Sequence, residues 1–259
     1  MTPKAGLLTD KVILVTGASR GIGQCIAETY AQHGAELILT AEPDKQGDLD
    51  KVAQTCKKHG SKEAHVLCCD LTDKQQIDTL AKNIFKQRSG GVHVLVNNAG
   101  TLGPLDFDKG EHMGQGPLDG DPDEWERMYQ ANVLANMRLV RLLCPAMKDA
   151  GEGWVININS SNGLKPSPAT AAYCTSKWGM RGWSLTCHEA MKEHGIRVTT
   201  IYPPAVSTPM TWERPDMDPV TELEAQPEDI AEAALLPFKC SQNTLPVEIM
   251  IQTLKNYKK

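Results

Sequence analysis

Residues 12–23 read VILVTGASRGIG and contain the feature that decides the fold. A short apolar run typical of a buried strand is followed by a glycine-rich loop and then by a helical pattern. Gly17 allows a tight turn after the strand, and Gly21 and Gly23 leave room for a pyrophosphate and for close packing of the helix. The helix amino terminus offers free N–H groups and positive dipole to an anion. The spacing Gly-x-x-x-Gly-x-Gly therefore indicates a dinucleotide-binding loop, with a structural turn that holds no ligand as the alternative.

This strand-then-helix pattern recurs along the chain. Apolar runs typical of strands occupy Val12–Val15, Glu36–Thr40, His65–Cys69, His93–Asn97, Trp154–Asn159, Val198–Tyr202 and Val247–Ile251. Helical patterns occupy Ile22–His33, Leu49–His59, Gln75–Gln87, Trp125–Ala150, Ala171–His194 and Glu228–Phe238. The alternation predicts a single α/β domain over residues 1–259, with parallel strands and helices on both faces. Ligands of such sheets bind beyond the carboxyl ends of the strands, so functional residues are expected just after strands.

The composition is that of an ordinary globular protein. Of the 259 residues, 41% are apolar and 23% are charged, which suits one large core. The net charge of -5, without a basic block, argues against nucleic-acid binding. The first apolar run is too short to cross a membrane and does not resemble a signal peptide, so we expect no membrane association and a cytoplasmic location. The eight cysteines contain no Cys-x-x-Cys pair and no ligand group with metal spacing, so we expect mostly buried free thiols and no metal.

Polar residues follow the third and fourth predicted strands. Asp70 could accept a hydrogen bond from an adenine amino group, and it could equally cap the next helix. The stretch Asn97-Asn98-Ala99-Gly100 offers small residues and side-chain amides that suit a wall under a cofactor ribose. The alternative is a turn, which Asn and Gly favour.

Tyr173 and Lys177 are four positions apart at the start of the longest late helix. Positions i and i+4 share a helix face, so the hydroxyl and the ammonium can point into one cleft. A free tyrosine has a pKa of about 10, and a nearby ammonium would lower that pKa by favouring the phenolate. Tyr173 could then give a proton to a carbonyl oxygen or take one from an alcohol. Because Tyr-x-x-x-Lys is common by chance, an ordinary surface pair is the alternative.

Two further polar residues could complete this site. Ser160 lies just past the fifth predicted strand, thirteen residues before Tyr173, and its hydroxyl could hold a substrate oxygen. Ser161 is its rival. Asn132 lies within a predicted helix, where Asn is a mediocre helix former; it could open a water-filled proton path near Lys177 or simply face solvent.

Together these residues resemble the short-chain dehydrogenase/reductase family. The matching pieces are the 16–23 loop, Asp70, Asn97–Gly100, Asn132, Ser160, Tyr173, Lys177 and the stretch Pro203…Val206…Thr208-Pro209-Met210. They occur in family order and spacing from Leu8 to about Ile251. The resemblance implies one Rossmann-type doubly wound domain with a seven-stranded parallel sheet, and hydride transfer between a nicotinamide and a carbonyl or alcohol carbon. It also implies a catalytic tetrad of Asn132, Ser160, Tyr173 and Lys177.

The resemblance further implies how a nicotinamide cofactor would be held. Lys177 would also bind the nicotinamide ribose, and the backbone near Val206 and the Thr208 side chain would hold the carboxamide. The expected cofactor-binding residues are Gly17, Ser19, Arg20, Gly21, Ile22, Gly23, Glu42, Asp70, Leu71, Asn98, Ala99, Gly100, Tyr173, Lys177, Pro203, Val206 and Thr208. Pro204 departs from the glycine that usually follows the proline in this family. A homodimer or homotetramer, joined through the helices that carry Asn132 and Tyr173, is expected by the same resemblance.

The choice between NADP and NAD depends on residues near the second strand. Arg20 is placed to pair with a 2′-phosphate, since a guanidinium suits phosphate geometry. Ala41 stands where many NAD-dependent relatives carry an acid, which favours NADP. Glu42 opposes this, because a carboxylate near a phosphate is repulsive unless it turns outward. The sequence therefore favours NADP slightly over NAD.

We expect an enzyme that reduces a small ketone or aldehyde. An alcohol dehydrogenase working in the oxidative direction and a catalytically silent nucleotide-binding protein are the alternatives. Substrate choice is expected to depend on the loops at about 101–124 and 204–225. Met210, Trp212 and Leu164 could line an apolar pocket, whereas core packing is the expected role of Trp178.

Overall fold

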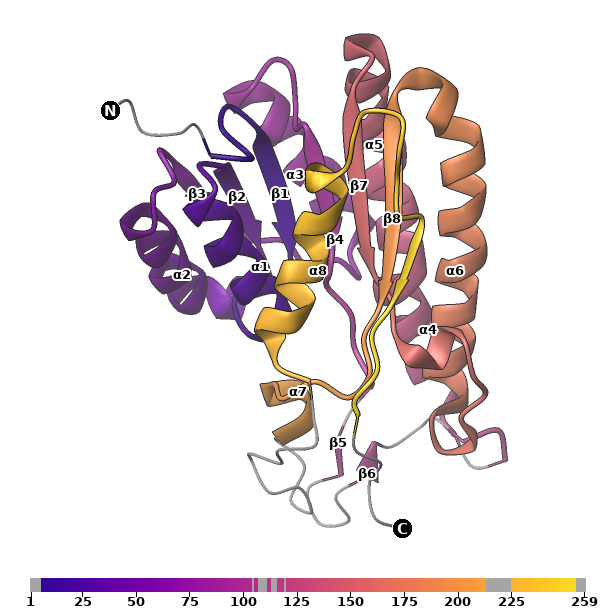
Figure 1. The fold of residues 1–259 in the computed structure, drawn as a ribbon. Helices are drawn as coiled ribbons and strands as arrows, with labels where there is room; N and C mark the ends of the chain where they lie inside the picture. The colour runs from indigo at the N-terminus through magenta and orange to yellow at the C-terminus, as the bar shows by residue number, and fades with distance from the viewer. Residues whose placement is uncertain are drawn as a thin grey trace.

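The computed structural model describes residues 6–103, 105–106, 111–112, 116–118, 120–212 and 225–254. Within these ranges seven parallel strands form the main sheet, in the order β3-β2-β1-β4-β7-β8-β9 (Figure 1). The strands are β1 (Val12–Thr16), β2 (Glu36–Thr40), β3 (Ala64–Val66), β4 (Val94–Asn97), β7 (Gly153–Ile158), β8 (Ile196–Tyr202) and β9 (Glu248–Met250). A separate antiparallel pair consists of β5 (Leu105–Asp106) and β6 (Glu111–His112). The order reverses direction between β1 and β4, which is where a doubly wound sheet opens a crevice for a ligand.

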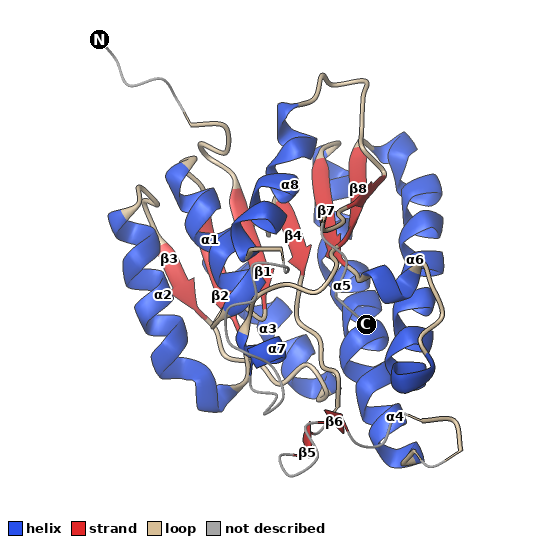
Figure 2. Cartoon of the chain, turned by 60° about the horizontal axis from the view of Figure 1, so that its bottom comes forward, coloured by secondary structure: helices blue, strands red, loops and turns tan. Residues whose placement is uncertain are grey.

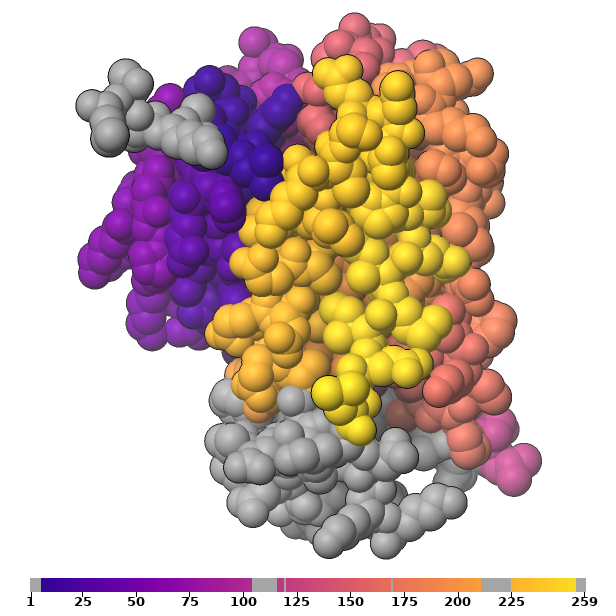
Figure 3. Space-filling model, viewed as in Figure 1, coloured from indigo at the N-terminus to yellow at the C-terminus, as the bar shows by residue number. Residues whose placement is uncertain are grey.

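Helices cover both faces of the sheet (Figure 2). They are α1 (Gly21–Gln32), α2 (Gln46–Lys58), α3 (Lys74–Gln87), α4 (Pro122–Tyr129), α5 (Ala135–Ala150), α6 (Ala171–Met191), α7 (Pro209–Trp212) and α8 (Pro227–Lys239). Helices α1, α2 and α8 pack on one face, and α3, α5 and α6 pack on the other. In the space-filling view, α8 and the C-terminal segment (yellow) cover the sheet between α1 and α6 (Figure 3).

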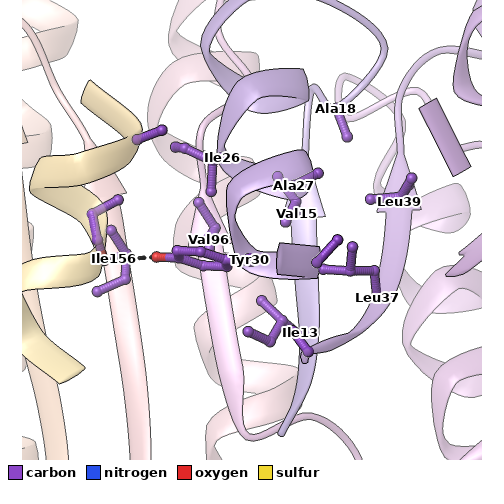
Figure 4. Packing of buried hydrophobic residues seen from close by; sticks show 14 of the residues in the cluster. Ile13, Val15, Ala18, Ile26, Ala27, Tyr30, Leu37, Leu39, Val96 and Ile156 are labelled. Atoms are coloured by element: carbon purple, nitrogen blue, oxygen red, sulfur yellow. Dashed lines mark hydrogen bonds between the residues drawn. The ribbon is translucent and has the colours of Figure 1, made fainter. Parts of the chain in front are cut away.

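The strands are apolar on both sides because both faces are buried. Ile13 and Val15 belong to the core under α1 and α8, whereas Leu14 belongs to the core under α3 and α5. Tyr30 lies in the first core with no exposed surface, and its hydroxyl donates a 2.7 Å hydrogen bond to the Ala234 carbonyl (Figure 4). This bond satisfies the polar end of the ring, so α1 and α8 can pack closely around it.

The expected α/β class and seven-stranded parallel sheet are confirmed, but several element boundaries differ by two or three residues, and two of these differences are informative. The third strand was predicted over His65–Cys69 and instead covers Ala64–Val66, although Leu67 still donates a backbone hydrogen bond to Leu39 of β2 and Cys69 donates one to Ala41, just after β2. The helix predicted over Trp125–Ala150 starts at Pro122. It is interrupted at Gln130–Leu134 by a short π-helical turn, which we call the π-turn. A π-turn inserts one residue without breaking the chain's helical course, so apolar periodicity does not reveal it.

Candidate active site

The glycine-rich loop has the backbone that a dinucleotide requires. Gly17 and Gly21 have φ values of 62° and 59°, in the region that residues with a Cβ rarely adopt. A Cβ on Gly23 would lie 2.2 Å from the Gly17 carbonyl oxygen and 2.4 Å from Asn98 Nδ2. Helix α1 begins at Gly21 without a side-chain cap and without an acidic residue in its first turn. Its first N–H groups and its positive dipole are therefore suited to a pyrophosphate.

The Asn98 side chain is hydrogen-bonded to the backbone of the glycine-rich loop. Its Nδ2 donates to the carbonyls of Thr16 at 2.9 Å and Gly17 at 3.1 Å. The Thr16 hydroxyl in turn accepts from the backbone N–H groups of Asn98 and Ala99. Asn97 points into the core, where it donates to Asn157 Oδ1 at 2.9 Å. Both amides were expected as cofactor wall, but their amino groups bond to protein, and Ala99 and Gly100 form much of the wall instead.

Two adjoining cavities run along the carboxyl edge of the sheet. A cavity of about 430 Å³ extends from the glycine-rich loop to Tyr173 and Lys177, and one of about 300 Å³ lies beside Asp70. They share wall residues Gly17, Glu42, Ala99, Gly100 and Arg127. Leu71 lines the smaller cavity, and the larger is lined by Ser19, Arg20, Gly21, Ile22, Asn98 and Thr208. Among the residues predicted to bind the cofactor, Gly23, Pro203 and Val206 line neither cavity.

Asp70 does not cap a helix. Its Oδ1 accepts hydrogen bonds from the backbone N–H and the hydroxyl of Thr72, at 2.8 and 2.7 Å. The cap of α3 is Asp73, which accepts from the N–H groups of Gln75 and Gln76. The capping alternative is therefore wrong, and Asp70 stays available as a wall of the smaller cavity.

Four charged residues surround the larger cavity next to β2. Arg20 and Glu42 were predicted there, and Asp44 and Lys45 were not. Lys45 forms an ion pair with Asp44 at 3.0 Å, and that partner raises the pKa of Lys45, while nearby Arg20 acts in the opposite direction. A 3₁₀ turn at Pro43–Lys45 brings Lys45 back toward Arg20. No sequence motif marks this turn, so only the tertiary structure shows that two cations approach each other here.

The loop after β8 reaches the glycine-rich loop. The Cβ of an alanine at Gly21 would lie 3.3 Å from Thr208 Cγ2, so Thr208 lies directly against the turn that precedes α1. Val206 is buried, and its backbone pairs with Ala225. Pro203 is also buried, and its carbonyl accepts from the Ser161 N–H at 2.8 Å. The bridge at Val206 is formed by its neighbours: the Ser207 N–H donates to the Ala225 carbonyl at 2.9 Å, and the Ala205 carbonyl accepts from the Ala225 N–H at 3.1 Å. Pro204 is partly exposed beside Pro203.

Asn132 lies in the π-turn and has no exposed surface. Its Oδ1 accepts from the Thr101 N–H at 2.8 Å, and its Nδ2 donates to the Thr101 carbonyl at 2.9 Å. The same Nδ2 donates to the Ser176 hydroxyl at 3.1 Å. The solvent-facing alternative for Asn132 is therefore wrong: its side chain connects the loop after β4 to helix α6.

Ser160 and Tyr173 meet at the end of the larger cavity. Ser160 ends the segment after β7, and its hydroxyl accepts from the Asn162 N–H at 3.1 Å. It also lies close enough to the Tyr173 phenol to lower the pKa of that group. Among the described residues, the hydroxyl that acts on the pKa of Tyr173 is that of Ser160 and not that of Ser161, which favours Ser160 over its rival.

Lys177 is buried one turn beyond Tyr173. Its ammonium donates to the Ile158 carbonyl at 3.2 Å and lies 5.5 Å from the centre of the Tyr173 ring. Burial lowers the pKa of Lys177 to about 8, because a charge is poorly solvated in the protein interior. The pair therefore shares one cleft, as its spacing predicted.

The predicted direction of the Tyr173 pKa is wrong for the protein alone. Burial raises the pKa of Tyr173 to about 12, and the nearby Ser160 hydroxyl acts against this rise. Desolvation outweighs the effect of an ammonium that lies beside the ring and is bonded to a backbone carbonyl. The phenol is consequently protonated at neutral pH, which is the form that can donate a proton.

One group of potential metal ligands occurs in the described ranges, at Glu36, Glu63 and His65. The Arg88 guanidinium forms ion pairs with both carboxylates and thus takes the place that a cation would occupy between them. Glu36 is the first residue of β2, Glu63 precedes β3 and His65 lies within β3, so the group is at the amino-terminal edge of the sheet, opposite the edge that carries Tyr173. Among the described helices, none is long and apolar enough to cross a membrane.

Comparisons with known proteins agree with this geometry. A family profile described as short chain dehydrogenase matches residues 11–219. An uncharacterized oxidoreductase of Staphylococcus saprophyticus is 30% identical over 88% of this chain and 91% of its own. A solved metagenomic short-chain oxidoreductase in complex with NADP is 31% identical, with a TM-score of 0.78 over 96% of this chain and 100% of its own. A short chain dehydrogenase from Escherichia coli CFT073, complexed with NADPH, is 27% identical, with a TM-score of 0.82 over 96% and 99%. The chain thus belongs to the short-chain dehydrogenase family of oxidoreductases.

Proposed function

We propose that this protein is an NADP-dependent reductase that converts a ketone or aldehyde into an alcohol, with Tyr173 as the general acid. The observation that carries the proposal is the Tyr173 phenol. Burial raises its pKa and so favours the protonated form, the Ser160 hydroxyl lies close enough to act on that pKa, and Tyr173 lines a cavity that begins at the glycine-rich loop. A proton donor at one end of a dinucleotide cleft is the arrangement that carbonyl reduction needs.

Each residue of the site has a distinct part in this reaction. A bound nicotinamide supplies the hydride that the carbonyl carbon receives. The Ser160 hydroxyl hydrogen-bonds the carbonyl oxygen and holds it next to the phenol. Tyr173 donates its proton to that oxygen as negative charge develops there. Lys177, whose ammonium is 5.5 Å from the centre of the Tyr173 ring, stabilises the resulting phenolate and would also bond the nicotinamide ribose.

NADP is favoured over NAD by two cations at the end of the cleft that lies near β2. Arg20 and Lys45 both line the larger cavity there. A 2′-phosphate would bring together the guanidinium and the ammonium that otherwise repel each other. Glu42 is exposed, so its carboxylate can turn outward. The metagenomic and Escherichia coli relatives were crystallised with NADP and NADPH, which supports the same choice.

A homodimer or homotetramer is part of the proposal. Trp178 was expected in the core but is 46% exposed, on the outer side of α6. Leu134 and Tyr129, on the neighbouring α4–α5 segment, are 43% and 37% exposed. Contact with another subunit would bury these large side chains. Light scattering coupled to size-exclusion chromatography tests this state, and a monomer at micromolar concentration would contradict it.

The function is tested with purified protein, NADPH or NADH, and a panel of aldehydes and ketones. We expect consumption of NADPH with at least one carbonyl compound and a lower KM for NADPH than for NADH. Clear preference for NADH contradicts the cofactor proposal. Tight NADPH binding without turnover of any carbonyl or alcohol would instead indicate the silent nucleotide-binding alternative.

A further inference from the structure

Ser176 is a fully buried hydroxyl next to the site, and nothing in the reaction above uses it. It lies on α6 between Tyr173 and Lys177, with no exposed surface. Its hydroxyl donates to the Tyr173 carbonyl at 2.7 Å and accepts from Asn132 Nδ2 at 3.1 Å. Ser176 is therefore bonded at the same time to the turn that carries the phenol and to the π-turn.

The rest of the Asn132 side chain is already bonded to Thr101, through both its oxygen and its nitrogen. Thr101 follows Ala99 and Gly100, which form the cofactor wall. A Cβ on Gly100 would lie 3.1 Å from Asn132 Oδ1 and 3.6 Å from Lys177 Nζ, so these groups are closely packed around the wall. One continuous set of hydrogen bonds thus joins the wall, the π-turn and the catalytic turn of α6.

We propose that Ser176 is a positioning residue, which fixes the catalytic turn of α6 against the π-turn and the cofactor wall. The inference rests on the roles proposed above for Tyr173 and Lys177. Apolar packing between two helices leaves small sliding and rotation inexpensive, whereas a buried amide N–H that loses its acceptor is costly. The bond to Ser176 therefore selects one register of α6, and a shift of about 1 Å at reacting groups can reduce a rate by up to about 100-fold.

Ser184 provides a matched control on the same helix. It is 2% exposed, its hydroxyl donates to the Met180 carbonyl at 2.7 Å, and it accepts from Asn157 Nδ2 at 2.9 Å. Removing either hydroxyl leaves one buried amide N–H without its acceptor. Of these two serines, only Ser176 is bonded to the turn that carries Tyr173. Replacing each with alanine therefore distinguishes an effect on stability from an effect on the position of the catalytic turn.

The experiment compares S176A, S184A, N132A and the double variant S176A/N132A. Turnover is followed with NADPH and 4-nitrobenzaldehyde, an electron-poor carbonyl compound, and Tm is measured in parallel. For S176A we expect kcat to fall about tenfold with less than a twofold change in KM for NADPH. S184A should show a similar fall in Tm with kcat unchanged. The double variant should be no slower than N132A, because Ser176 acts through Asn132.

The proposal would be overturned by any of three results. These are a kcat of S176A equal to that of the wild type, a loss of kcat in S184A as large as in S176A, and a double variant that is slower than N132A by the factor that S176A alone shows. If S176A does not fold, S176C keeps the volume with a much weaker acceptor and is judged by the same outcomes. A crystal structure of the variant decides the matter even if the wild type reduces no carbonyl compound, in which case the proposed function fails separately. Asn132 and the Tyr173 turn should be displaced from each other in that structure, and unchanged positions overturn the inference.

Discussion

The hydroxyl of Ser160 lies close enough to the phenol of Tyr173, at the end of the cofactor cleft, to lower the pKa of that phenol, although thirteen residues separate the two in the chain. Ser160 comes from the carboxyl end of β7 and Tyr173 from the first turn of α6. A carbonyl oxygen placed between them can accept a hydrogen bond from each. The two hydroxyls therefore define where a substrate oxygen would be held.

Replacing Tyr173 with Phe should remove the proton donor and keep the ring. We expect kcat to fall by about 10²–10⁴-fold, the usual contribution of a general acid. NADPH affinity, measured by cofactor fluorescence, should change little. Tyr129→Phe is the control, because Tyr129 is a partly exposed tyrosine on α4. Turnover that survives in Tyr173→Phe would show that another group donates the proton.

The rate of reduction should depend on pH through Lys177 before it depends on Tyr173. The pKa of Tyr173 is raised to about 12, so the phenol keeps its proton across the neutral and mildly alkaline range. The pKa of Lys177 is lowered to about 8, so its ammonium is lost as the pH rises through that value. We expect kcat for reduction to be level near pH 7 and to decline above pH 8. A rate that rises through this window would contradict the role given to the ammonium.

Lys177→Met should stabilise the protein while it abolishes efficient turnover. The pKa of Lys177 is lowered from 10.5 in the unfolded reference to about 8 in the fold, so the unfolded chain binds more protons between these values. The wild type should therefore gain stability as pH rises from about 8 toward 10. At pH 7 the buried charge costs roughly 3 kcal/mol by the same shift, at about 1.36 kcal/mol per pKa unit, and methionine avoids that cost.

Urea unfolding of both proteins at pH 7 and pH 9.5 measures this difference. The stability gap between Lys177→Met and wild type should narrow at the higher pH. Above about pH 10 the raised pKa of Tyr173 acts in the opposite direction, because the unfolded tyrosine ionises first, so the lower window is the informative one. An equal gap at both pH values would show that Lys177 is not destabilised by burial.

Arg20→Ala and Lys45→Ala should each weaken binding of NADPH and leave NADH almost unaffected. A charge-assisted bond to phosphate contributes about 1.5–3 kcal/mol, so KM for NADPH should rise by about 10- to 100-fold. Lys51→Ala on α2 is the control, since Lys51 lies outside both cavities and pairs with Asp48. An equal change for both cofactors would place these cations elsewhere than at the 2′-phosphate.

Gly23→Ala should disrupt the phosphate loop, whereas Gly47→Ala should be tolerated. The added Cβ at position 23 would meet the Gly17 carbonyl at 2.2 Å, while nothing lies within 4 Å of a Cβ at Gly47. We expect Gly23→Ala to lose NADPH binding and Tm. Gly47→Ala, in helix α2, should gain up to about 1 kcal/mol of stability. Equal behaviour of the two variants would contradict the close packing seen at Gly23.

The sheet could be read from the sequence because strands buried on both faces give unbroken apolar runs. All seven expected strands occur, and the largest boundary error lies at the edge strand β3, where pairing with one neighbour gives the weakest constraint. The π-turn could not be predicted, since its residues continue the helical apolar pattern. Asn132 was nevertheless singled out, because Asn is a mediocre helix former.

The sequence by itself determined the family, the order of the strands and helices, and the positions of Ser160, Tyr173 and Lys177, because strand ends and helical spacing bring these groups to one edge of the sheet. The tertiary structure decided the direction in which the pKa of Tyr173 shifts, the approach of Lys45 to Arg20 and the bond between Asn132 and Ser176. These three properties depend on burial and on contacts between segments far apart in the chain. A local pattern of residues does not reveal the desolvation or the distances between segments that produce these three properties.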